Sequence, residues 1–552
     1  MLPQRMHFTG LLPMTTRRRT GSGVLLLALL VWTGCGDVFR PVANPIPGPP
    51  PDPQNFHFAI VASQNAPGNP GSGMQIDVSG DTNVGTVKTG SLGVVPPGQG
   101  PVHAAILPPS AARVYVANGM DDTVSTFTPA SIFGSIGAAS TITLPQGSDP
   151  IFVHSTESQT MYVANKGILS ALSPICPGTS TVAAINTASE VVTKFICVGP
   201  HPTVLAETPN AQKLYSVNGD GTISSINPVD LSVNPPIPSS AFSATPIWAV
   251  TSLDNSALFV LDQAGTLSAF DTFNDKFVAA TTPALATPDA NFLLLDRHLN
   301  RLYATNPRNN TVTVLDAATT SVNSAAPRGP QLLATVALPS AATNPVMVTA
   351  LNDGTQAYVI SEQTIPSSSP TTLNWQVTAI RTSDNTVVGG QPIASGTVDL
   401  TSADPGALNV CSNARFRTAI ASSQDSSKVY VTVCDAGTTN IIRTSGNTLV
   451  AAVNSPVSAY VSSTVTISAV AVSGSSSTYT YSLSSGSSLR VGMAMNISGM
   501  SDSANNGTFV IASLGSGTFT VTNPSAVSAT GQAGMGIASP PPQNPVWVVA
   551  GP

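Results

Sequence analysis

Three histidines are the residues of this chain whose type could bind a metal ion. His103, His154 and His201 lie in or beside short apolar segments that are each led by a proline. Imidazole is a common ligand of transition metals, so a ring of such side chains could hold one. Counted from the leading proline, however, they stand at positions +2, +4 and −1. Because alternate residues of a strand point to opposite faces, the three cannot share one face, and we predict no metal site.

The cysteines could form disulfides. The chain has five, and four of them fall into two local pairs, Cys176 with Cys197 and Cys411 with Cys434. Neither pair has the CxxC spacing of a redox or zinc site. An exported protein keeps disulfides, and the even number supports pairing, so we predict two structural disulfides.

Motifs of catalysis and cofactor binding are missing. The sequence holds no GxSxG, HExxH, Walker or CxxCH motif, and we expect no cofactor. NGDGT at 218–222 resembles the start of a calcium loop, but Val229 stands where the acidic twelfth residue is required, which favours a tight turn. Several aspartates fall where strands are expected to end and turn, which is typical of capping. They are Asp149, Asp262, Asp271, Asp289 and Asp316.

The N-terminus predicts export. Basic residues at 17–19 precede an apolar run from Val24 to Trp32, which is too short for a bilayer that needs roughly 20 residues, as in a secretory signal. The Gly34-Cys35 junction resembles the lipobox of bacterial lipoproteins, although Trp32 stands where leucine is usual. The resemblance implies a signal peptide at 1–35 and a lipid on Cys35. The alternative is an ordinary signal in which Cys35 is incidental. The proline-dense stretch 36–56 predicts an extended stalk.

Composition excludes some function classes. Charged residues make up only 9 % of the chain, against about 25 % in typical soluble proteins, and the net charge is −6. There is no basic footprint for nucleic acid, and we expect no such partner. The hydrophobic share of 42 % indicates a folded chain, whose 5 % of aromatic residues leaves its cores to small aliphatic side chains.

One pattern of strands and turns repeats along the chain. It begins with RVYVANGMDDTVSTF at 113–127, with weaker copies at 357–361 and 428–444. The strong copies are TMYVANKGILSAL at 160–172, KLYSVNGDGTISSIN at 213–227, ALFVLDQAGTLSAFD at 257–271 and RLYATNPRNNTVTVLD at 301–316. A proline-led apolar strand precedes most copies, such as DPIFVH at 149–154. The middle copies have roughly the 40–50-residue period of propeller blades.

The repeated strand must be covered on both sides. Val114 and Val116 would face one way, and Tyr115 and Ala117 the other, so both faces are apolar. Sheets packed face to face around an axis satisfy this requirement.

The YVxN strand, its polar turn and the following Thr-rich strand resemble the YVTN-type β-propeller repeat of exported bacterial and archaeal proteins. The resemblance implies an all-β propeller at 57–454 with seven or eight four-stranded blades, and our count favours eight. The N-terminal blade lacks a first strand, and NPVWVVAGP at 544–552 copies the proline-led pattern. We therefore expect residues 541–552 to close the ring, which leaves no open edge.

Residues 455–540 interrupt the repeat. They are rich in Ser, Gly and Thr and alternate apolar with polar residues, which predicts a small inserted β module. It is either a decorative insertion or a projecting contact module.

Two functions compete. The first is a monomeric, lipid-anchored, extracytoplasmic binding or scaffold protein with a protein or polysaccharide partner, held at the membrane only by its lipid. The second is a lactonase, because similar propellers include sugar lactonases, with Arg301, Arg417 and His201 as candidate groups that form no recognisable motif. Redox work on a quinone cofactor, which similar propellers also perform, has no motif to support it.

Overall fold

The chain is all-β. The computed structural model describes residues 57–64, 71–78, 81–89, 100–108, 113–130, 136–171, 173–280, 290–318, 329–365, 372–399, 411, 414–456, 463–483, 489, 493–539 and 543–551. The predicted signal peptide, Cys35 and the whole stalk at 36–56 lie outside them, as does Asp289. Within these ranges the helices are single 3₁₀ turns, and none is long and apolar enough to cross a membrane.

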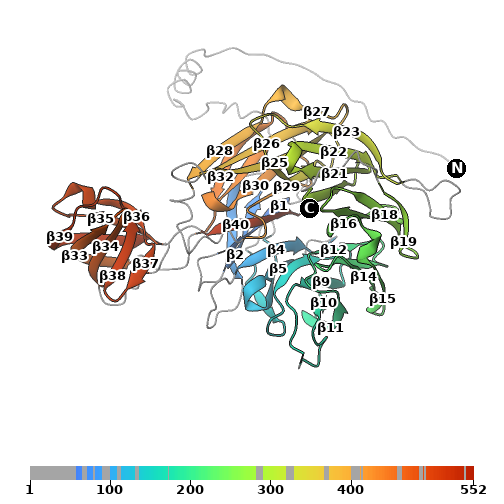
Figure 1. Cartoon of the computed structure of the whole chain (residues 1–552), viewed down its shortest axis with the longest axis horizontal. Helices are drawn as coiled ribbons and strands as arrows, with labels where there is room; N and C mark the ends of the chain where they lie inside the picture. Colours follow the sequence, from blue (N-terminus) through green and yellow to red (C-terminus); the bar gives the residue numbers. More distant parts are fainter. Residues whose placement is uncertain are drawn as a thin grey trace, which may run out of the picture. The chain divides into compact units, whose positions relative to one another are not determined.

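Eight antiparallel sheets form the blades of a propeller (Figure 1). Blade 1 holds β40 and β1–β3, blades 2 to 6 hold β4–β7, β8–β11, β12–β15, β16–β19 and β20–β23, blade 7 holds β24–β28, and blade 8 holds β29–β32. In blade 7 both β27 and β28 pair with β26, so its outer strand is split in two. The predicted eight-bladed propeller is therefore confirmed.

Each blade contributes four strand positions, from the channel outward. The first strands are β40 (Asn544–Ala550), β4 (Pro101–Ile106), β8 (Pro150–His154), β12 (Val204–Glu207), β16 (Pro246–Thr251), β20 (Phe292–Asp296), β24 (Pro345–Ala350) and β29 (Thr418–Ser422). The second strands are β1 (Phe58–Gln64), β5 (Val114–Asn118), β9 (Thr160–Asn165), β13 (Leu214–Val217), β17 (Ala257–Asp262), β21 (Arg301–Asn306), β25 (Gln356–Ile365) and β30 (Lys428–Val433). The third strands are β2 (Gly71–Asp77), β6 (Thr123–Phe127), β10 (Ser180–Asn186), β14 (Ile223–Asn227), β18 (Leu267–Asp271), β22 (Thr311–Asp316), β26 (Thr372–Arg381) and β31 (Thr438–Arg443). The outer strands are β3 (Thr82–Thr89), β7 (Ser140–Thr143), β11 (Val191–Val198), β15 (Ser232–Ile237), β19 (Lys276–Ala280), β23 (Gln331–Ala337), β27 (Thr386–Val387), β28 (Ala394–Asp399) and β32 (Thr448–Asn454).

The ring is closed by the C-terminal strand. Each first strand contacts the first strands of both neighbouring blades, from β40 through β4 and β8 around to β29 and back. β40 pairs antiparallel with β1, so the last strand of the chain completes the first blade. This closure, predicted from the proline-led C-terminus, pairs an edge that would otherwise be open.

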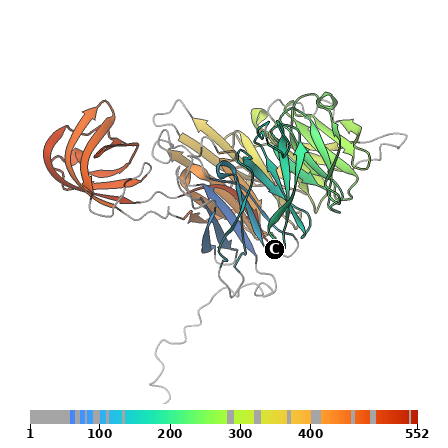
Figure 2. The same ribbon diagram turned by 90° about the horizontal axis from the view of Figure 1, so that it is seen from below.

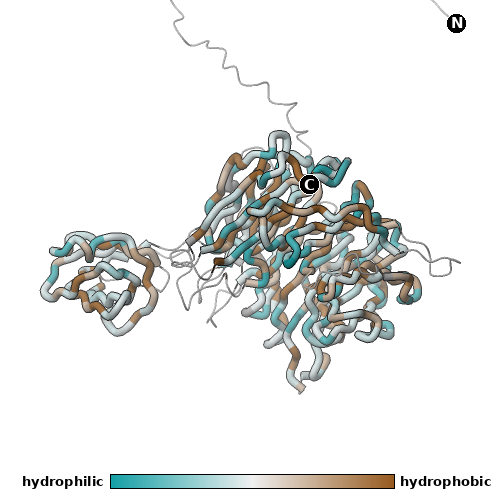
Figure 3. The backbone as a smooth tube through the Cα atoms, turned by 45° about the horizontal axis from the view of Figure 1, so that its top comes forward, coloured by the Kyte–Doolittle hydropathy of each residue, from teal (hydrophilic) through white to brown (hydrophobic). Residues whose placement is uncertain are grey.

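The second strand is the buried layer of every blade. All five residues of β5 are buried, as its two apolar faces require. Tyr115, Tyr162, Tyr215, Tyr303, Tyr358 and Tyr430 are at most 1 % exposed, as is Phe259. Figure 2 shows the blades from a second direction, and Figure 3 shows apolar strands joined by more polar turns.

The asparagine of the YVxN strand joins two strands within a blade. The Asn118 amide donates to the hydroxyls of Thr123 and Ser125 at 3.1 and 2.9 Å. The Asn218 amide donates in the same way to Thr222 and Ser224 at the start of its third strand, and the Asn165 amide donates to Thr181. The asparagine and the Thr-rich strand therefore recur together because one satisfies the other in a buried place.

Ion pairs join neighbouring blades. Lys213, directly before β13, binds Asp275 of the β18–β19 turn at 2.7 Å, and Lys428 of β30 binds Asp81 of the β2–β3 turn at 2.5 Å. Asp275 and Asp81 hold positive φ values of 59° and 54°, a conformation that aspartate tolerates in turns. In each pair, a lysine of one blade lies opposite an aspartate of the next blade.

The inserted segment forms a separate seven-stranded sheet. Its strand order is β36-β35-β39-β33-β34-β38-β37. The strands are β33 (Ser463–Ser473), β34 (Ser476–Leu483), β35 (Ala494–Ser498), β36 (Gly507–Val510), β37 (Ser513–Gly515), β38 (Thr518–Thr522) and β39 (Ala529–Ser539). Its own core includes Met493, Met495, Tyr479 and Phe519. We predicted a small β module here, although the pattern did not identify β33 and β39, its two longest strands.

Candidate functional site

Five of the eight first strands share a bulge at the central channel. In β40, β4, β8, β16 and β24 the pairing register shifts at the residue after the leading proline. Proline cannot donate to the ladder, and a bulge re-aims the next side chain. Pairing with the second strands then gives each blade one equivalent position. The residues there, called the collar below, are Trp547, His103, Phe152, Val204, Trp248, Phe292, Met347 and Ala419.

Collar side chains touch one another across blades. The His103 ring lies 3.9 Å from the Phe152 ring and 4.3 Å from the Trp547 ring, centroid to centroid. Trp248 and Phe292 are 4.6 Å apart. Aromatic rings therefore occupy five of the eight collar positions and pack against their neighbours.

A segment just before β29, residues 414–417, enters the channel where the collar is small. We call it the plug. The Phe416 ring lies 4.6 Å from Trp547 of blade 1 and 6.4 Å from Trp248 of blade 5. Blades 1 and 5 face each other across an eight-bladed ring, so Phe416 occupies its centre.

Arg415 lies beside Phe416. Its guanidinium donates to the carbonyls of Ile151 and Thr203 at 3.1 and 2.6 Å and lies 5.5 Å from the Phe152 ring centre. Burial lowers the pKa of Arg415 to about 10, so it stays charged at neutral pH. The plug thus puts one cation among aromatic faces, which stabilise it.

Two of the three predicted histidines line this channel. Burial, followed by the charge of Arg415, lowers the pKa of His103 well below its ordinary value. Burial lowers the pKa of His154 to about 4. Both are neutral at physiological pH. His201 lies in the turn before β12 with φ of 52°, away from the strand positions of the other two.

The plug is fastened at both ends. Cys411 forms a disulfide with Cys434, with Cα atoms 5.7 Å apart. Arg417 binds Asp435 through Nε and Nη2 at 2.6 and 2.7 Å. The second disulfide, Cys176–Cys197, joins the loop before β10 to β11. Both disulfides favoured by the cysteine spacing are present.

An acidic residue with an unusual pKa accompanies Arg417. Glu362 Oε1 lies 3.9 Å from Arg417 Nε. Burial raises the pKa of Glu362 to about 7, against the lowering effect of Arg417. A carboxyl with such a pKa can accept and return a proton near neutrality. Arg417 donates two hydrogen bonds, from Nε and Nη2, to Asp435, as expected of a residue with a positioning role.

The other candidate residues from the sequence do not lie with Glu362 and Arg417. Arg301 donates to the Thr382 carbonyl at 2.6 Å, on the seam between blades 6 and 7. Asp262, Asp271 and Asp316 end β17, β18 and β22. Asp220 of the NGDGT segment accepts from Thr222, as a tight turn requires. In the described part of the chain, no group of three or more His, Cys, Asp or Glu side chains is placed to hold a metal ion.

Arg417 and the histidines were predicted candidates, whereas the plug and the collar were not predicted from the sequence. A signal for the collar was present: the residue two positions after the leading proline is His103, Phe152, Trp248, Met347 or Trp547. Arg415 and Phe416 belong to no repeat, so no pattern marked them.

No protein-family model and no curated protein matches this sequence. Solved structures with some similarity include apo AztD from Citrobacter koseri, 13 % identical over 72 % of this chain and 95 % of that one, with a TM-score of 0.45. The periplasmic gluconolactonase PpgL of Pseudomonas aeruginosa is 14 % identical over 62 % of this chain and 96 % of its own, with a TM-score of 0.43. Hydrazine synthase of Kuenenia stuttgartiensis is 15 % identical over 56 % and 87 %, with a TM-score of 0.37. These similarities are too distant to assign an activity to this chain.

Proposed function

We propose that this protein is an exported, lipid-anchored propeller that acts as a monomeric binding or scaffold protein. The observation that carries the proposal is the position of Phe416, which contacts Trp547 and Trp248 from opposite blades. A sugar-sized substrate would have to displace this ring to reach the middle of the channel. Binding surfaces would then lie on the outer faces of the blades or on the inserted module.

Export fits the covalent structure. Two disulfides persist in an oxidising compartment such as the periplasm or the cell surface. A lipid on Cys35 and the proline-rich stalk would hold the propeller away from its membrane. The expected partner is a protein or a polysaccharide of the cell envelope.

Cosedimentation with isolated cell-envelope material tests this role. We expect the purified protein to sediment with the envelope, before or after protease digestion of that material. Retention after digestion would indicate a polysaccharide partner, and loss would indicate a protein. If the protein stays in the supernatant with every envelope preparation, the binding role is wrong.

A lactonase is the second candidate, and Glu362 favours it. A carboxyl with a pKa of about 7 could deprotonate water, while Arg417 could stabilise the oxyanion of an opening lactone. Hydrolysis of D-glucono-1,5-lactone, compared between the wild type and Glu362→Gln, separates the two candidates. We expect no turnover above the uncatalysed rate. Turnover that Glu362→Gln abolishes would establish the enzyme instead.

A further inference from the structure

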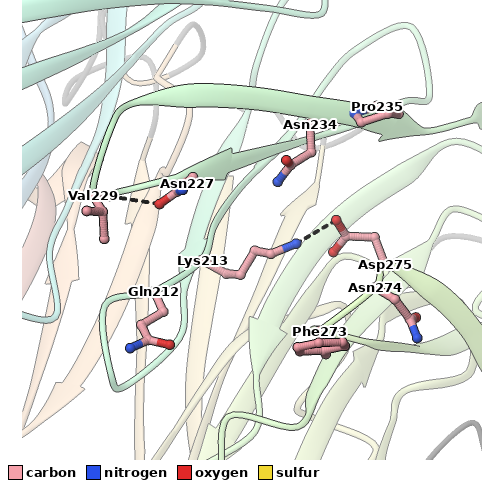
Figure 4. Close-up of a pocket in the computed structure, with 9 residues that line it drawn as sticks. All are labelled: Gln212, Lys213, Asn227, Val229, Asn234, Pro235, Phe273, Asn274 and Asp275. Atoms are coloured by element: carbon pink, nitrogen blue, oxygen red, sulfur yellow. Dashed lines mark hydrogen bonds and ion pairs between the residues drawn. The ribbon is translucent and has the colours of Figure 1, made fainter.

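A groove lies between blades 4 and 5, away from the channel (Figure 4). It has a volume of about 580 Å³, within the range of small-molecule and cofactor sites. Its floor is the Lys213–Asp275 ion pair. Lys213 reaches across to Asp275 between Asn234 on one side and Phe273 on the other (Figure 4).

The floor of the groove is rigid and electrically balanced. Asp275 accepts from Lys213, from Ser225 and from the Tyr215 hydroxyl, each within 2.8 Å. The Lys213 charge is therefore already compensated. An anionic ligand would find no free cation here, and a cationic one no free carboxylate.

The walls offer amide groups with unused hydrogen-bonding capacity. Gln212 is exposed, and its side chain makes no hydrogen bond to any described residue. The Asn274 side-chain oxygen accepts from the Lys276 backbone N–H, which leaves its NH₂ group available to a ligand. An amide both donates and accepts, as a sugar hydroxyl does, so the two are matched partners.

Two apolar side chains stand at the rim. Phe273 is 91 % exposed and Val229 is 83 % exposed, far more than most large apolar residues of this chain. An aromatic face carries negative potential and attracts polarised C–H groups, such as those on one face of a pyranose ring. A protein partner is a poorer fit, because interface cores are depleted of charged residues and this floor consists of an ion pair.

We propose that this groove binds an uncharged glycan chain built from hexopyranose units. One sugar face would stack on Phe273, and hydroxyl groups would pair with Gln212 and Asn274. The inference rests on the proposed binding role and gives it a ligand class.

Calorimetric titration with neutral hexaoses tests the groove. The probes are the α-1,4-, β-1,3- and β-1,4-linked glucose hexamers and the β-1,4-linked mannose hexamer, with hexagalacturonate as the acidic control. We expect at least one neutral hexaose to bind and the acidic one not to bind. Phe273→Ala should weaken binding about tenfold, and Gln212→Ala should weaken it several-fold. Leu332→Ala, at a side chain that is also exposed at 46 %, should change nothing.

Three results of the titrations would overturn the groove as a glycan site: no neutral hexaose binds, binding survives both Phe273→Ala and Gln212→Ala, or hexagalacturonate binds more tightly. Because both groove residues are exposed, the variants should fold, and an unchanged melting temperature checks this. Cosedimentation with envelope that Phe273→Ala leaves intact would keep the binding role while contradicting the groove. Its absence in the wild type would contradict the role itself.

Discussion

At the scale of single residues, the asparagine of YVxN works as a clamp inside a blade. Asn118→Ala removes two hydrogen bonds and leaves the buried hydroxyls of Thr123 and Ser125 without that donor. We expect the free energy of unfolding to fall by about 1–3 kcal/mol. Urea unfolding measures this loss. Gln263→Ala, at an exposed turn position, is the control, and an equal effect of both variants would contradict the clamp.

Glu207 makes a prediction about pH. Its side chain is buried at the end of β12, its Oε2 accepts from the Thr156 amide, and burial raises its pKa to about 7. Between pH 4.5, its ordinary pKa, and pH 7, the folded protein therefore holds a proton that the unfolded chain has lost. The stabilisation of the folded state by Glu207 is complete below this pH window and declines as the pH rises through it.

The matching variant is Glu207→Gln, which keeps the acceptor for Thr156. Relative to this variant, the wild type should lose stability from pH 4.5 to 7, at a slope of up to about 1.4 kcal/mol per pH unit. Unfolding curves at several pH values measure the difference. A difference that is constant or that grows with pH would show that the carboxyl is already ionised when folded.

At the scale of elements, the strands that belong to the repeat could be predicted from the sequence. Apolar residues on both faces of β5 indicated a buried strand, and the proline before Val546 indicated the closing strand. The plug was not predictable in this way. Arg415 and Phe416 act through contacts with blades 1, 3, 4 and 5, which only the closed ring brings together. The groove is equally non-local, because Lys213 and Asp275 belong to different blades.

The disulfides allow a comparison between two elements of similar loop length. Their sequence separations are 21 and 23 residues, so replacing either pair by serine should lower the free energy of unfolding by about 3 kcal/mol. Only the Cys411→Ser/Cys434→Ser variant loosens the plug. It should change the tryptophan fluorescence of the native state, because Phe416 contacts Trp248 and Trp547. Equal spectra for both variants would show that the disulfide does not hold the plug.

At the scale of the whole molecule, we expect the propeller to fold without the inserted module. The module leaves the propeller after β32 and returns before β40. At that point the Gln543 amide donates to the Pro456 carbonyl at 3.0 Å. The two ends of the insertion are thus already adjacent within the propeller. A short loop can replace the module at little cost in chain entropy.

We therefore predict that replacing residues 457–542 by a short Gly/Ser loop leaves a folded propeller. Its midpoint of unfolding in urea should stay close to that of the wild type, because the module has its own core and adds none to the blades. Removing β40 as well is the contrasting change. Loss of β40 exposes the edge of β1 and takes away its contacts with β4 and β29, so we expect aggregation on size-exclusion chromatography and rapid proteolysis. If the first deletion unfolds the ring, the module is part of the folding unit. If the protein that also lacks β40 stays monomeric and protease-resistant, the pairing of β40 with β1 is not needed to close the ring.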